Sequence, residues 1–226
     1  MRRFLSGIVF CLCVIGFSVG AQEKPQRILV IGDSLMAIHS LVGRSVADVL
    51  QSMLGTPVTD RSVLGARMIY KLPISGRLGL SIPAQFRGKS WDWVVMTGGG
   101  NDLWLGCGCN RCERKLDRLI AEDGTRGEIP KLFARIQKAG AQVVYVGYLR
   151  SPGINTPIES CKDEGDALEA RVARLADRVP GVFFLSNQDL VPPRDTSYFG
   201  VDGIHPSLKA SRAIAARITA FLRRVK

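Results

Sequence analysis

The sequence predicts an α/β fold, a three-layer α/β/α sandwich with a central, mostly parallel five-stranded sheet. Two observations support this class. Short, continuous apolar runs recur along the chain and alternate with longer segments of helical length, and this alternation is typical of parallel sheets that helices cover on both faces. Small and polar residues follow several of the runs, as expected where a ligand binds at the carboxyl ends of parallel strands.

Five apolar runs are the candidate strands of this sheet. The first, 27–31, is continuous and ends at Gly32, which is the pattern of a strand buried on both faces. The run at 57–61 has the weakest pattern. The candidate strands are 27–31, 57–61, 91–96, 141–148 and 181–185.

Four segments between or after these runs have the length of helices. They are 41–54, 128–139, 163–178 and a last helix from Pro206 onward. Between residues 211 and 226, five basic residues interleave with apolar ones, at the spacing of an amphipathic helix. We interpret the basic residues as a solvated helix face; the alternative is a weak attraction to anionic envelope surfaces.

The composition is that of an ordinary globular protein. The chain has 226 residues, of which 46% are hydrophobic and 23% charged, close to the ~45–50% and ~25% of typical soluble domains. This composition excludes global disorder. The length suffices for one domain with a large core, and no internal repeat or linker divides it.

The first 21 residues have the pattern of a secretory signal peptide. A basic start at Arg2 and Arg3 precedes the apolar run 4–19, and Ala21 ends a small-residue cleavage site. The run is shorter than the ~20 residues that span a bilayer, although an uncleaved anchor is the alternative. We expect an exported domain at 22–226, periplasmic or secreted, whose net charge is 11 − 2 = +9. A nucleic-acid partner is not expected, because export separates the chain from it and no recognition motif is present.

Two short motifs follow the first and third candidate strands. Ser34 lies in Gly-Asp-Ser-Leu, where a strand-to-helix turn presents a hydroxyl and a backbone N–H to the same space. Asn101 follows Gly99 and Gly100, and its amide can donate to a developing oxyanion. Taken singly, Ser34 could be only a helix cap and Asn101 only a turn former. The neighbouring Asp33 and Asp102 are expected to make structural hydrogen bonds.

A third motif places a carboxylate three residues before a histidine. Asp202 and His205 lie on a glycine-containing turn before the last helix. At this spacing the carboxylate can bind one ring nitrogen and leave the other free to act as a base; the alternative is a capping aspartate beside an incidental histidine. The other histidine, His39, has no adjacent acid, and we interpret it as structural or at the edge of the pocket.

In this order, the three motifs resemble the SGNH/GDSL hydrolase family, and the resemblance covers the whole of 22–226 as one domain. It implies a flavodoxin-like fold and ester hydrolysis through an acyl-enzyme, with Ser34 as nucleophile, His205 as general acid and base, and Asp202 orienting the histidine. The N–H groups of Ser34 and Gly65 and the amide of Asn101 would form the oxyanion hole. Gly65 has the place of the family's glycine after the second strand, although the asparagine that many members carry shortly before it is absent.

The resemblance implies that the reaction needs no cofactor and no metal. It also implies that the substrate is a small-molecule, lipid or carbohydrate ester. We also expect a monomer. The apolar side chains of Met36, Leu103 and Trp104 suit an acyl chain, as in a lysophospholipid or a thioester. Trp104 stacked on a sugar would instead fit a carbohydrate O-acetylesterase. Two further alternatives are that these side chains only seat the loop, and that the protein is a non-catalytic binding protein on the same fold.

Four of the six cysteines follow the predicted signal peptide, and an even number in an exported protein favours two disulfides. A bridge between Cys107 and Cys109 would be strained, so we expect Cys161 to pair with one member of the cluster Cys107, Cys109 and Cys112. The alternative is a four-thiolate zinc site, but its ligands often come in close pairs and Cys161 stands alone. The cluster begins five residues after Asp102, so a bridge is expected to fix the rim of the site.

Overall fold

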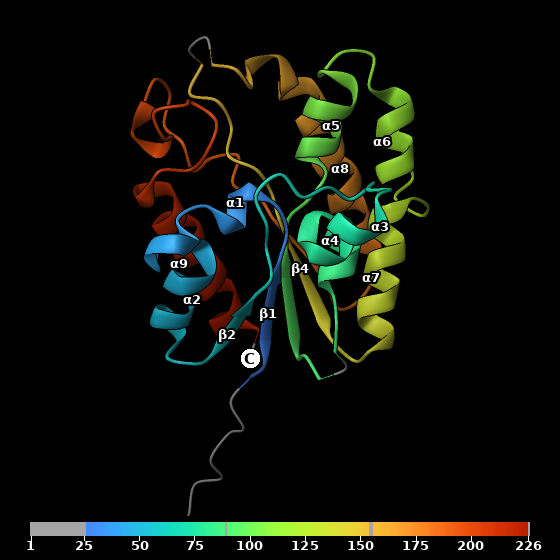
Figure 1. Cartoon of the computed structure of the whole chain (residues 1–226), viewed down its shortest axis with the longest axis vertical. Helices are drawn as coiled ribbons and strands as arrows, with labels where there is room; N and C mark the ends of the chain where they lie inside the picture. The colour runs from blue at the N-terminus through green and yellow to red at the C-terminus, as the bar shows by residue number, and fades with distance from the viewer. Residues whose placement is uncertain (1–25, 89, 154–155, 226) are drawn as a thin grey trace, which may run out of the picture.

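A computed structural model describes residues 26–88, 90–153 and 156–225 (Figure 1), and the expected signal peptide lies outside these ranges. Five strands form one sheet in the order β2-β1-β3-β4-β5, and every neighbouring pair is parallel. The strands are β1 (Ile28–Ile31), β2 (Val58–Asp60), β3 (Trp93–Met96), β4 (Gln142–Val146) and β5 (Val182–Leu185). The predicted fold class and all five candidate strands are confirmed.

Helices cover both faces of the sheet (Figure 1). One face carries α1 (Ser34–Ala37), α2 (Val46–Leu54) and α9 (Leu208–Arg224). The other carries α4 (Ile82–Gln85), α5 (Gly100–Cys107), α6 (Glu113–Leu119), α7 (Glu128–Lys138) and α8 (Lys162–Arg178). The remaining short elements are η1 (Ser40–Val42), α3 (Pro73–Ser75), η2 (Gly76–Leu80), η3 (Glu159–Cys161) and η4 (Thr196–Tyr198). None of the helices within the described ranges has the length and apolar character needed to cross a bilayer.

The helix expected at 41–54 begins later, at Val46. Ser45 caps it, because its side chain accepts the N–H of Asp48 while the Asp48 carboxylate accepts the N–H of Ser45. Gly43, with a φ of +64°, separates this helix from the preceding short turn. The helical pattern therefore identified the element, and the capping box sets its first residue.

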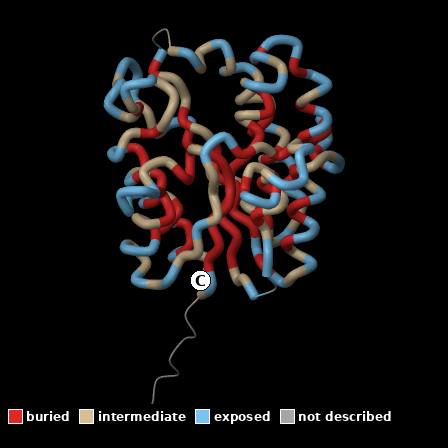
Figure 2. Tube along the Cα trace, in the orientation of Figure 1, coloured by how far each residue is buried: buried red, intermediate tan, exposed pale blue. Residues whose placement is uncertain are grey.

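The strands are buried because each packs side chains into both layers. In β1, Leu29 and Ile31 contact the layer of α4 to α8, whereas Ile28 and Val30 contact α2 and α9. All four side chains are at most 1% exposed, and Figure 2 shows the sheet as the buried centre of the molecule. A strand buried on both faces needs a continuous apolar run, which explains why the sequence signal was clear.

The strand order determines where a ligand can bind. β1 lies between β2 and β3, so the chain leaves β1 toward one edge of the sheet and later returns to its other side. In the flavodoxin-like order this switch point opens a crevice at the carboxyl ends of β1 and β3. Ser34 follows β1 and Asn101 follows β3, so both lie at this crevice.

Two disulfides lie next to this edge of the sheet. One joins Cys109 to Cys161, with the Cα atoms 4.8 Å apart, and the other joins Cys107 to Cys112, with the Cα atoms 5.5 Å apart. Cys161 thus pairs with a member of the cluster, as expected. Because all four sulfur atoms are in disulfides, the zinc alternative is not supported.

The two disulfides should contribute unequally to stability. In the chain-entropy model, the bridge between Cys109 and Cys161, 52 residues apart, stabilises the fold by about 4 kcal/mol, and the bridge between Cys107 and Cys112, 5 residues apart, by about 2 kcal/mol. Urea unfolding of the paired variants Cys109→Ser/Cys161→Ser and Cys107→Ser/Cys112→Ser measures both losses. An equal loss in the two variants would contradict the prediction.

Candidate active site

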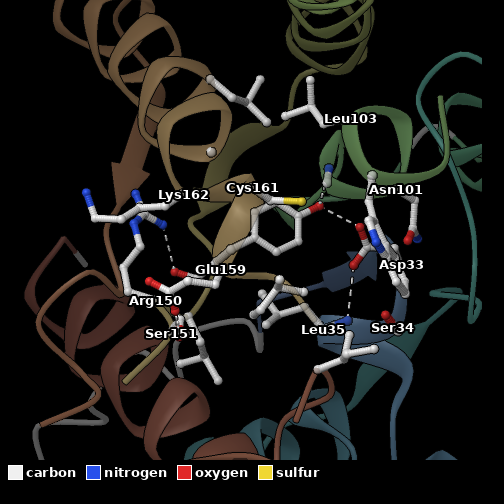
Figure 3. Close-up of a pocket in the computed structure, with 18 of the residues that line it drawn as sticks. Asp33, Ser34, Leu35, Asn101, Leu103, Arg150, Ser151, Glu159, Cys161 and Lys162 are labelled. Carbon is white, nitrogen blue, oxygen red and sulfur yellow. Dashed lines mark hydrogen bonds between the residues drawn. The ribbon is translucent and has the colours of Figure 1, made fainter. Parts of the chain in front are cut away.

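A tight turn holds Ser34 at the end of β1. Gly32 has a φ of +147°, and a Cβ there would come within 2.9 Å of Thr97, so glycine is required for this close approach. The carboxylate of Asp33 then accepts the N–H of Leu35 at 3.0 Å and caps α1. Ser34 is the first residue of this helix, is half-buried and lines a cavity (Figure 3).

The Asp33 carboxylate links the segments that follow three strands. Tyr148, which follows β4, donates its hydroxyl to Asp33 Oδ2 at 2.5 Å and accepts the N–H of Gly100, which follows β3, at 3.0 Å. Burial raises the pKa of Asp33, and the hydrogen bonds from Tyr148 and Leu35 oppose this rise. Tyr148 was not expected in the site, although its place directly after a strand is a signal that could have identified it.

Asn101 and Asp102, at the start of α5, bind the loop that follows β2. The Asn101 amide donates to the carbonyl of Ala66 at 3.1 Å. The Asp102 carboxylate accepts the N–H groups of Met68 and Ile69, each at 2.8 Å. Asp102 is 2% exposed, and this burial raises its pKa to about 6 against the effect of the two hydrogen bonds. Asp102 therefore has the structural role that was expected of it.

Gly65 belongs to the same loop and precedes the carbonyl that Asn101 binds. Its φ of +74° lies in the left-handed region that favours glycine. An added Cβ would meet no atom within 4 Å, so the space in front of Gly65 is open. Gly65 is not among the residues that line the cavity, whereas Ser34 and Asn101 are.

The structure brings Asp202 and His205 together as their spacing predicts. His205 Nδ1 lies 2.6 Å from Asp202 Oδ2, and Asp202 Oδ1 accepts the N–H groups of Ile204 and His205 at 2.9 and 3.0 Å. Partial burial acts to raise the pKa of Asp202, but the hydrogen bonds from His205 and Ile204 outweigh it and lower this pKa to about 2. The ionised carboxylate holds the proton on Nδ1, which leaves Nε2 available for proton transfer.

His205 stands at the rim of the cavity that Ser34 lines. Its chain neighbours Ile204 and Pro206 line the same cavity, whereas His205 itself is not among the lining residues. Among the described residues no hydrogen bond joins the Ser34 hydroxyl to the His205 ring.

Met36 and His39 lie outside the cavity. Met36 is fully buried in the core against α2 and α9, because two positions along a helix turn a side chain by about 200° from Ser34. The expectation that Met36 contacts substrate is therefore wrong. His39 Nε2 lies 3.0 Å from the carbonyl oxygen of Pro206, which agrees with a structural histidine.

The cavity has a volume of about 220 Å³. Leu103 and Trp104, both expected at the rim, line it together with Cys161. Because Cys161 is bonded to Cys109, a disulfide forms part of the wall. In Figure 3 Ser34 lies on one side of the cavity, beside Asp33 and Asn101, and the segment that carries Arg150 lies on the other.

The charge of Arg150 in the cavity wall is balanced inside the fold. Arg150 binds both oxygens of Glu169, at 2.8 and 2.9 Å, and Asp166 at 2.7 Å. Glu169 is 3% exposed and also accepts the N–H of Tyr148 at 2.7 Å. Since these carboxylates neutralise the charge of Arg150, no negative charge on a substrate is needed to balance it.

The chain belongs to the GDSL-like lipase/acylhydrolase family. The family model matches residues 30–213, a range that begins in β1, ends in α9 and includes all three motifs. The protein is therefore a hydrolase of the SGNH/GDSL type that acts on ester bonds, as the resemblance implied. A comparison with curated proteins finds no match.

Solved structures share the fold over nearly the whole chain. A GDSL-like lipase from Bacteroides thetaiotaomicron is 15% identical, with a TM-score of 0.62 and coverage of 89% of this chain and 89% of that one. A carbohydrate acetylesterase family member from Sinorhizobium meliloti is 16% identical, with a TM-score of 0.62 and coverage of 88% and 98%. A carbohydrate esterase family 2 enzyme from Corynascus thermopiles is 17% identical, with a TM-score of 0.59 and coverage of 91% and 68%. At these identities the likeness shows the fold.

Replacing Asp102 should change how stability depends on pH. The folded chain keeps the Asp102 proton up to about pH 6, whereas an ordinary aspartate releases it near 3.8, so between these values the folded state binds more protons than the unfolded one. The free energy of unfolding of the wild type should therefore fall, relative to that of Asp102→Asn, by up to about 3 kcal/mol as the pH rises from about 4 to about 6. Urea unfolding of both proteins across this range measures the difference, and a constant difference would contradict the prediction.

Proposed function

We propose that this hydrolase is an exported serine esterase that cleaves carboxylic esters through an acyl-enzyme. One observation carries the proposal: Ser34 and Asn101 line a single cavity, and the paired Asp202 and His205 stand at its rim. A serine hydroxyl is a weak nucleophile until a neighbouring base removes its proton. The histidine would supply that base and the aspartate would orient it.

In the proposed reaction, His205 Nε2 removes the proton from Ser34 as Oγ attacks the ester carbonyl carbon. The N–H groups of Ser34 and Gly65 and the amide of Asn101 donate to the oxyanion that forms. The alcohol leaves with the proton from His205. A water molecule, deprotonated by the same nitrogen, then attacks the acyl-enzyme, and His205 returns the proton to Ser34 Oγ as the acid leaves. Asp202 stays ionised throughout and stabilises the imidazolium.

The orientation of Asn101 supports its role in the oxyanion hole. An amide nitrogen carries two hydrogens, and Asn101 gives one of them to the carbonyl of Ala66. This bond fixes the side chain and leaves the second hydrogen for substrate. A donor held in place before the reaction stabilises the transition state without reorganisation.

The cavity supports an acyl ester, a lysophospholipid or a thioester as substrate. Leu103, Leu149 and Leu168 give it apolar walls. Its volume of about 220 Å³ is below the ~300–1,000 Å³ of pockets for drug-sized ligands, which favours a short or medium acyl chain. Trp104 in the same wall supports a second candidate, a carbohydrate O-acetylesterase in which the indole stacks on a sugar.

Export and a monomeric state are also part of the proposal. The basic start and the apolar run 4–19 support export. The two disulfides, Cys109–Cys161 and Cys107–Cys112, fit an oxidising compartment.

Ser34→Ala should abolish the turnover of p-nitrophenyl esters, and Asn101→Ala should lower kcat by about 10²–10³. The thermal midpoint of Ser34→Ala should equal that of the wild type, because a half-exposed hydroxyl adds little to stability. Ser40→Ala, at an exposed serine close along the chain, is the matched control and should keep full activity. Undiminished kcat/KM in Ser34→Ala would refute the assignment.

The length of the acyl chain should be limited by the cavity. Gly165 in α8 lines it, and an added Cβ there meets no atom within 4 Å. We expect p-nitrophenyl butyrate or octanoate to be cleaved faster than palmitate, and Gly165→Leu to lower kcat/KM for octanoate about tenfold more than for acetate. Activity confined to acetate and to acetylated sugars, and lost in Trp104→Ala, would instead establish the carbohydrate esterase.

A further inference from the structure

Nine large aliphatic side chains are exposed in the part of the chain that the structure describes, and all lie on segments that leave the carboxyl ends of the strands. They are Leu41, Val42, Leu64, Leu72, Ile74, Leu78, Leu105, Val201 and Leu208. Exposed leucines scattered singly are ordinary. Four of these nine, however, belong to the one segment between β2 and α4.

Three of these four side chains, Leu72, Ile74 and Leu78, belong to a loop of residues 68–80, which we name the apolar loop. Its base is closed, because the N–H of Arg67 donates to the carbonyl of Leu80 at 2.9 Å. The buried side chain of Gln85 donates to the carbonyl of Gly79 at 2.7 Å. The first residues of the loop are held by the buried carboxylate next to the oxyanion-hole amide. The apolar loop is thus held at both of its ends, although none of its residues lines the cavity.

The apolar loop exposes both apolar and basic side chains. Leu72, Ile74 and Leu78 are 64%, 79% and 78% exposed, and Lys71 and Arg77 beside them are exposed as well. These three aliphatic side chains remain in water although the loop is held at its base. An apolar surface of this kind marks an interaction site.

The charge around the apolar loop indicates the kind of partner. Between residues 61 and 88 the chain has five basic residues and no aspartate or glutamate. Aliphatic side chains bordered by cations are the combination that binds an anionic bilayer, because the acyl region takes up the apolar groups and the head groups attract the charges. A polysaccharide offers no such apolar phase.

We infer that the apolar loop docks the protein on an anionic lipid surface, with Leu72, Ile74 and Leu78 inserted among the lipids and Lys71 and Arg77 at the head groups. The inference concerns binding and does not depend on the proposed catalytic roles. A second cationic surface exists on α9, but its buried apolar face is packed in the core. Attraction through α9 would therefore be electrostatic alone.

Vesicle sedimentation tests the role of the aliphatic side chains. Purified protein is mixed with vesicles of phosphatidylglycerol and phosphatidylcholine or of phosphatidylcholine alone, in the Ser34→Ala background so that hydrolysis cannot alter the lipid. We expect binding to the anionic vesicles only, and a loss of about tenfold or more in affinity for the triple variant Leu72→Ser/Ile74→Ser/Leu78→Ser. Equal binding to both vesicle types, or no binding to either, would overturn the inference.

A matched pair of charge variants tests the location of the surface. Lys71→Gln/Arg77→Gln should weaken binding to the anionic vesicles about tenfold, and added salt should weaken binding of the wild type. Arg212→Gln/Arg224→Gln removes the same charge from exposed positions of α9 and should leave affinity within about twofold, because those side chains lie outside the docking surface. A larger loss of affinity in Arg212→Gln/Arg224→Gln than in Lys71→Gln/Arg77→Gln would place the contact on α9 and overturn the inference. Self-association in solution that the triple aliphatic variant abolishes would overturn it as well.

Discussion

A buried carboxylate directly before Ser34 sets the geometry at the carboxyl edge of the sheet. Asp33 is 1% exposed, and a buried charge is tolerated only where hydrogen bonds satisfy it. Its partners are the N–H that begins α1 and the hydroxyl of Tyr148, which in turn holds the N–H of Gly100 at the start of α5. The position of Ser34 and that of the neighbouring Asn101 are therefore set by one connected group of hydrogen bonds.

Gly100 shows how tightly this group is packed. A Cβ at this position would come within 2.8 Å of the Tyr148 ring, so a side chain at residue 100 would displace the tyrosine from Asp33. The same reasoning applies to Gly147, where a Cβ would come within 2.8 Å of the buried Glu169 carboxylate. In both places glycine allows a polar side chain to reach the backbone at the strand ends.

The sheet and the long helices could be predicted because their burial requires a periodic pattern of apolar residues in the sequence. Continuous apolar runs and 3.6-residue spacing are read along the chain without knowledge of its three-dimensional contacts. The short helices α5 and α6 were not predicted, and their region was interpreted only as a rim. Residues 103–119 carry three cysteines and many charges. A disulfide fixes this segment to Cys161 at the end of η3, and its local sequence pattern does not reveal that contact.

The motif residues of the site could be named from the sequence because each follows a strand or precedes a helix. The direction in which each neighbouring side chain points could not be predicted from the sequence. Met36 and Leu103 each lie two residues after a motif residue, yet Met36 is in the core against α2 and α9, whereas Leu103 lines the cavity. Tyr148 and Glu169 act through contacts with distant segments, so their roles depend on the assembled fold.

The closed base of the apolar loop has a consequence for proteolysis. Lys71 and Arg77 are exposed and offer trypsin-like proteases two cleavage sites in an otherwise compact domain. Both ends of the loop are bound separately, one to Asp102 and the other to Gln85. A chain cut after either basic residue would therefore stay assembled, and the nick would become visible only when the two fragments separate in denaturant.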